Sequence, residues 1–127
     1  MPLVIVNRDA TLVSDSVIND VAEMIRYTVA SHLNVFERHE AHLSTDDIQL
    51  IVRDVRKGLD VGCVPFSVTV FANDYPERRA NLEERSKKIA EQISRTLKHA
   101  SGDNILYASQ QRCFVWILLT PAGFAVL

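Results

Sequence analysis

The sequence predicts an α+β fold in which two tandem β-α-β repeats form one four-stranded sheet with two helices on one face. The first observation is the order of elements, which reads strand, helix, strand, and then the same again. The second is their spacing, because the matched elements lie 63 to 65 positions apart: Leu3 with Phe66, Val17 with Leu82, and Ile48 with Cys113. The third is the length of 127 residues, which suits a single core. We therefore expect one domain over 1–127, with repeat one at about 2–58 and repeat two at about 65–127.

The first repeat contains a short apolar strand, a long amphipathic helix and an alternating strand. Residues 3–6 have strand-forming character, and Ser14 is a typical N-cap for the helix that follows. The residues of one face of this helix then recur at helical spacing, and most of them are apolar: Val17, Ile18, Val21, Met24, Ile25, Thr28, Val29 and Leu33. Residues 48–55 alternate, so Gln49, Ile51 and Arg53 should project from the same face of the sheet.

The second repeat has the same plan. Residues 66–72 predict a strand, and Pro76 is expected near the first position of the second helix. Its buried stripe should comprise Leu82, Ser86, Ile89, Ile93 and Leu97. Residues 112–119 predict the last strand, on which Phe114 and Trp116 share one face.

The sheet face without helices is expected to be strongly apolar. We assign six side chains to it: Ile51, Phe66, Val68, Val70, Phe114 and Trp116. A patch of that size on a small domain is typical of a surface buried by association. The sequence therefore predicts an oligomer.

Composition excludes several classes of function. A formal net charge of −2 gives no electrostatic footprint for nucleic acid or an anionic membrane. The longest apolar run, 113–119, is far short of the ~20 residues of a membrane helix, and no secretory signal is expected. His39 and His42 lack the spacing of a helical zinc motif, and no cofactor fingerprint is present. We expect a cytoplasmic protein without metal or cofactor.

Two short motifs carry a resemblance to a known family. The chain opens Met-Pro and runs directly into a strand, and the run Arg79-Ala80-Asn81-Leu82-Glu83-Glu84-Arg85 follows the third strand. With the two β-α-β units, these motifs resemble the tautomerase superfamily, and most of all its fused-repeat members in the 5-carboxymethyl-2-hydroxymuconate isomerase family. The likeness in architecture covers nearly the whole chain.

The resemblance implies a homotrimer that isomerises a small unsaturated keto or enol carboxylic acid. Pro2, freed by removal of Met1, would be the catalytic base, and burial and nearby arginines would lower the pKa of its amine. Arg79, Arg53 and Arg78 are the candidate carboxylate ligands, and Trp116 is a candidate wall of the substrate site.

Other interpretations stay open. Where the family commonly has a substrate-binding arginine on the second strand, this chain has Gln49, so the protein could be a trimer without activity. The element order also fits a ferredoxin-like, dimeric binding or regulatory module. Arg78 also suits a surface charge, Arg53 an ion pair between subunits, and Trp116 a core or interface position.

Overall fold

The structure is a computed structural model that describes residues 2–38, 41–56, 59–60, 66–101 and 114–120. Its elements follow in the order β1 (Leu3–Arg8), α1 (Asp15–Leu33), the 3-10 turn η2 (Thr45–Asp47), β2 (Gln49–Asp54), β3 (Phe66–Asn73), α2 (Pro76–Ala80), α3 (Leu82–Ser101) and β4 (Phe114–Thr120). None of the helices within these ranges has the length and apolarity needed to span a bilayer. Several residues discussed above lie outside the described ranges: Met1, His39 and Cys113, together with residue 112 at the start of the predicted last strand.

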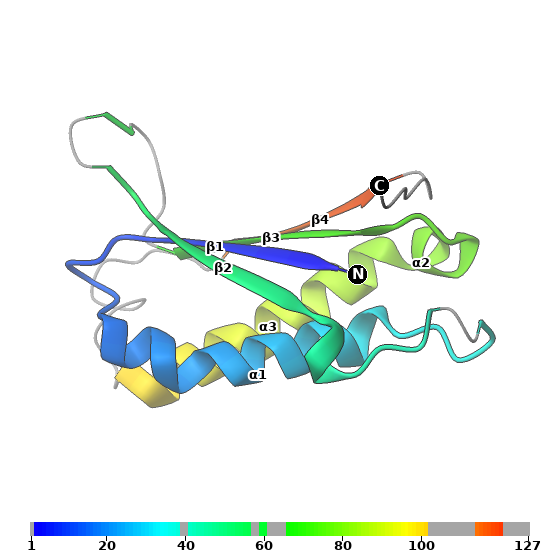
Figure 1. Ribbon diagram of the computed structural model, residues 1–127, viewed down its shortest axis with the longest axis horizontal. Helices are drawn as coiled ribbons and strands as arrows, with labels where there is room; N and C mark the ends of the chain where they lie inside the picture. Colours follow the sequence, from blue (N-terminus) through cyan, green and yellow to red (C-terminus); the bar gives the residue numbers. More distant parts are fainter. Residues whose placement is uncertain (1, 39–40, 57–58, 61–65, 102–113, 121–127) are drawn as a thin grey trace, which may run out of the picture.

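The four strands form one sheet in the order β2-β1-β3-β4. Parallel pairs β1–β2 and β3–β4 flank a central antiparallel pair, β1–β3. Both long helices, α1 and α3, cover one face of the sheet (Figure 1). This confirms the predicted fold. The ferredoxin-like alternative is wrong, because that split arrangement separates the two strands of each β-α-β unit, whereas here they pair directly.

The core lies between the sheet and the two helices. Ser14 caps α1 as predicted, with its side chain accepting a hydrogen bond from the backbone N–H of Val17. Fully buried aliphatic side chains meet there from every layer, including Val4 and Val6 of β1, Val21, Ile25 and Val29 of α1, and Ile89 and Ile93 of α3. Close packing of these side chains is the main force that fixes the helices on the sheet.

The prediction for β3 was wrong in its choice of face. Phe66, Val68 and Val70 are buried against the helices rather than exposed on the open face. The register explains this, because directly paired residues share a face and Val70 pairs with the core residue Val4. Ile51, Phe114 and Trp116 do lie exposed on the helix-free face, together with Leu118.

The second helix is divided where the sequence predicted one continuous element. Pro76 begins α2 as expected, but α2 ends at Ala80, and the φ of −135° and ψ of 36° at its C-cap Asn81 interrupt the helix before α3 begins. The predicted stripe of α3 is confirmed at its three buried positions, Ile89, Ile93 and Leu97. The interruption lets α2 leave the axis of α3 at the end of the sheet where the N-terminus lies (Figure 1).

Candidate functional site

Pro2 is buried at one end of the sheet, immediately before β1. Its carbonyl oxygen accepts a hydrogen bond of 3.1 Å from the backbone N–H of Gln49, at the start of β2. On the other side, the antiparallel register brings Phe71 opposite Leu3, so the end of β3 runs past Pro2. Pro2 therefore lies between the start of β2 and the end of β3.

Arginine side chains reach the backbone on both sides of Pro2. From α1, Arg26 Nε donates to the carbonyl of Ile48 at 3.0 Å. From α2, Arg78 Nη1 donates to the carbonyl of Asn73 at 2.9 Å. Ile48 comes directly before β2 and Asn73 is the last residue of β3. This end of the sheet thus holds two arginines together with carboxylates, among them Glu23, which pairs with Arg26, and Asp47 of η2, which directly precedes Ile48.

Arg78 is buried, so its interpretation as a surface charge was wrong. Its exposed fraction is only 2%, and its Nε donates to the carbonyl of Leu33, at the end of α1, at 2.9 Å. Burial lowers the pKa of the Arg78 guanidinium, and the nearby charge of Arg85 lowers it further. The side chain joins the end of β3 to the end of α1. No local pattern in the sequence indicated this burial, because two consecutive arginines at the start of a helix are usually exposed to solvent.

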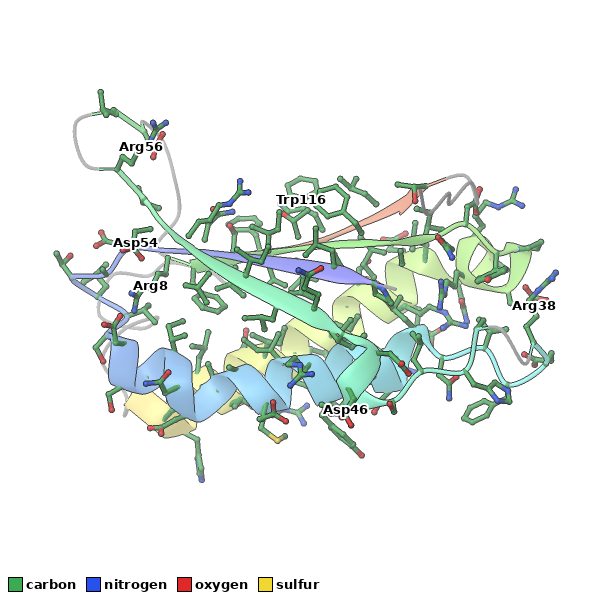
Figure 2. The ribbon with its side chains drawn as sticks, viewed as in Figure 1. Arg8, Arg38, Asp46, Asp54, Arg56 and Trp116 are labelled. Atoms are coloured by element: carbon green, nitrogen blue, oxygen red, sulfur yellow. The ribbon has the colours of Figure 1, made fainter. Side chains whose placement is uncertain are left out.

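Arg79 and Trp116 line the same groove, which runs along the outer edge of β4 beside the start of α3. The Arg79 side chain is 60% exposed, and its Nε lies 2.7 Å from Asp74 Oδ1 in a charge contact without hydrogen-bond alignment. Leu82 and Lys87 add an apolar and a cationic group to the lining. Figure 2 shows Trp116 on the side of the sheet away from the helices. The groove thus combines an exposed guanidinium with an aromatic wall.

Arg53 lies away from Pro2. It pairs in register with Asn7, whereas Gln49 pairs with Leu3, so Arg53 is about 13 Å further along the sheet than Gln49. At that far end, Arg8 forms ion pairs with Asp15 and, at 2.8 Å, with Asp54. Within one chain, the structure does not bring Arg53 together with Pro2 or Arg79.

A cluster that the sequence analysis missed surrounds Tyr75. Arg38 Nε lies 3.0 and 2.9 Å from the two carboxylate oxygens of Glu77. The guanidinium carbons of Arg38 and Arg78 lie 5.3 and 5.0 Å from the centre of the Tyr75 ring. The ion pair with Arg38 lowers the pKa of the Glu77 carboxyl. These residues are 37 or more positions apart from Arg38, so only the folded chain reveals the cluster.

No metal site is evident within the described part of the chain. Those residues contain no group of three or more His, Cys, Asp or Glu side chains able to hold a metal ion. His42, one member of the predicted histidine pair, has Nε2 at 2.8 Å from the carbonyl oxygen of Phe36.

Neither a protein-family model nor a curated protein matches the sequence. Solved structures do match the fold. A macrophage migration inhibitory factor-like protein from Entamoeba histolytica superposes with a TM-score of 0.62 at 8% identity, over 98% of this chain and 95% of that one. Malonate semialdehyde decarboxylase gives 0.62 at 13% identity, over 97% and 88% of the two chains. A member of the cis-3-chloroacrylic acid dehalogenase family gives 0.56 at 13% identity, over 98% and 79%.

Fold and topology together therefore define the class of structure. The chain has the α+β fold of the macrophage migration inhibitory factor and tautomerase superfamily. Identities of 8 to 13% establish that fold alone.

Proposed function

We propose that this chain is a cofactor-free tautomerase or isomerase that uses the free amine of Pro2 as its base. The observation that carries the proposal is the setting of Pro2, which is buried between two strands whose adjoining carbonyls accept hydrogen bonds from Arg26 and Arg78. Burial and nearby cations both disfavour a charged amine. A secondary amine kept neutral near working pH is suited to removing a proton next to a carbonyl group.

The substrate class follows from the groove. The exposed guanidinium of Arg79 can bind a carboxylate, and Trp116 offers a flat apolar surface to a conjugated carbon chain. The neutral Pro2 nitrogen would take the hydroxyl proton of an enol, and the resulting prolinium would deliver a proton to carbon. The sum is a tautomer of the same composition, so no other reactant is needed.

A homotrimer would complete the site. Pro2 does not line the groove of its own chain, because β3 lies between β1 and the groove strand β4. Packing of copies through the apolar helix-free face would cover Ile51, Phe114 and Leu118 and could bring the groove of one copy to Pro2 of another. This arrangement requires no contribution from Arg53.

The test compares the chain with and without Met1. With Met1 attached, the nitrogen of Pro2 is an amide and cannot act as a base, while Arg79 and Trp116 are unchanged. Processed protein, verified by intact mass, should accelerate ketonisation of 2-hydroxymuconate or enol-phenylpyruvate, and the form that keeps Met1 should not. Equal rates for the two forms would overturn the proposal. Pro2→Ala, which leaves a primary amine, should retain part of the activity.

A second candidate is a tautomerase-like assembly without this activity. Gln49 at the start of β2, together with the distant position of Arg53, favours it. Malonate semialdehyde decarboxylase has decarboxylase and hydratase activities. The assay should therefore include malonate semialdehyde as a further substrate. A processed trimer that converts none of these substrates would support the second candidate.

A further inference from the structure

The orientation of α2 depends on side-chain contacts, because the helix is too short to be stable by itself. It has five residues, whereas isolated helices shorter than about 12–15 residues are marginal in water. The irregular backbone at Asn81 separates α2 from α3. Arg79, the proposed carboxylate ligand, is carried on this short helix.

Two arginines connect α2 to the rest of the molecule: one belongs to α2 itself and the other to the segment after α1. Arg78 anchors it from within through the carbonyls of Leu33 and Asn73. Arg38 reaches it from the segment after α1 through the Glu77 carboxylate and the Tyr75 ring. Both members of the Arg38–Glu77 pair are about one-third exposed, at 36% and 32%, so the contact is partly shielded from water. Figure 2 shows Arg38 beyond α2, at the end of the molecule opposite Arg56.

We propose that Arg38 is a positioning residue whose contacts with Glu77 and Tyr75 fix α2 and so keep Arg79 in the groove beside Trp116. The inference rests on the proposed role of Arg79 as the substrate carboxylate ligand. Arginine suits this position because a planar guanidinium pairs with a carboxylate at its edge and stacks on a ring with its face. Lysine can supply only the charge.

The first experiment measures steady-state kinetics of the processed protein. Arg38→Gln and Glu77→Gln should each raise KM for enol-phenylpyruvate roughly fivefold or more, with kcat within about twofold, because substrate binding is lost and the base is untouched. The double variant should be no worse than Arg38→Gln alone, since the Arg38–Glu77 contact is already lost in that variant. Arg38→Lys should recover only part of the affinity.

Arg56→Gln is the matched control. Arg56 forms an ion pair of 3.0 Å with Asp60 at the opposite end of the molecule, so this variant removes the same charge and a similar contact. Its KM should equal that of the wild type. Wild-type KM in both Arg38→Gln and Glu77→Gln, in a protein where Arg79→Ala raises KM, would overturn the positioning role.

The second experiment measures binding without turnover. Trp116 is the sole tryptophan in the sequence and lines the groove with Arg79, so its fluorescence reports occupation of the groove. Titration of phenylpyruvate into the form that keeps Met1 should give a Kd that Arg38→Gln and Glu77→Gln weaken and Arg56→Gln does not. If that pattern appears but no form turns over substrate, the proposed chemistry fails and the positioning role stands. A wild-type chain that binds no carboxylate would overturn both.

Discussion

Adjacent arginines in this chain have opposite environments, and the difference has energetic consequences. Arg78 is buried and its side chain donates to the carbonyls of Leu33 and Asn73, whereas the side chain of Arg79 is mostly exposed and forms an ion pair with Asp74. Removal of Arg78 leaves buried acceptors without a donor, while an exposed arginine contributes little to stability. Arg78→Ala should lower the free energy of unfolding by about 2–4 kcal/mol, and Arg79→Ala by less than about 0.5 kcal/mol. Urea denaturation of the two variants measures this, and equal losses would contradict the assignment.

Replacement of Arg79 should change substrate binding, whereas replacement of Arg78 should change the stability of the fold. Arg79→Ala should remove the proposed charge-assisted hydrogen bond to the substrate carboxylate, which corresponds to about 1.5–3 kcal/mol and to a KM raised by more than tenfold. The far-ultraviolet circular dichroism spectrum and the folded fraction should stay those of the wild type. Unchanged kinetics would return Arg79 to the role of a surface charge held by Asp74.

At the scale of single elements, α1 begins where its sequence predicts. The Ser14 hydroxyl accepts from the N–H of Val17 at 3.3 Å, and satisfies one of the free donors at the helix start. Ser14→Ala should therefore lower the free energy of unfolding by about 1 kcal/mol. Ser16→Ala, an exposed serine inside the first turn, is the matched control and should change it by only a few tenths. Thermal or urea denaturation measures both variants, and equal losses of stability in Ser14→Ala and Ser16→Ala would contradict the capping role of Ser14.

Local sequence patterns correctly predicted the elements that depend only on neighbouring residues in the chain. Helical spacing gave α1, alternation gave the faces of β2, and Pro76 gave the start of α2. Long-range contacts decided the features that were missed. Val68 and Val70 could have pointed to either face, and pairing with Val6 and Val4 placed them in the core.

In the candidate site, too, local patterns predicted some residues and long-range contacts decided the others. Pro2, Arg79 and Trp116 were selected from motifs and from strand parity, and the structure places Arg79 and Trp116 on one groove. No local pattern distinguishes Arg38 from any other loop arginine, because its partner Glu77 is 39 positions away. Burial of Arg78 was equally hidden, since it depends on the carbonyl of Leu33, 45 positions distant.

For the whole molecule, the exposed helix-free face predicts association. Light scattering after size exclusion should give the mass of three chains, because the apolar side chains on that face need cover. Leu118→Lys should weaken this assembly, since it places a charge on the open face. Met24→Lys is the matched control, because Met24 on α1 has the same exposed fraction of 46% but lies on the helix layer. A monomeric or dimeric wild type would contradict the threefold arrangement.

The central antiparallel pair β1–β3 relates the two repeats by an approximate twofold axis, so each repeat offers an equivalent strand start, Leu3 in one and Phe66 in the other. A polypeptide has one α-amine, however, and the start of β3 is joined to preceding residues through a peptide bond. Duplication of the β-α-β unit therefore doubles the number of strand starts but not the number of α-amines. Under the proposed mechanism a working assembly therefore has one reactive nitrogen per chain, that of Pro2, because its counterpart in the second repeat, Pro65, has its nitrogen in a peptide bond.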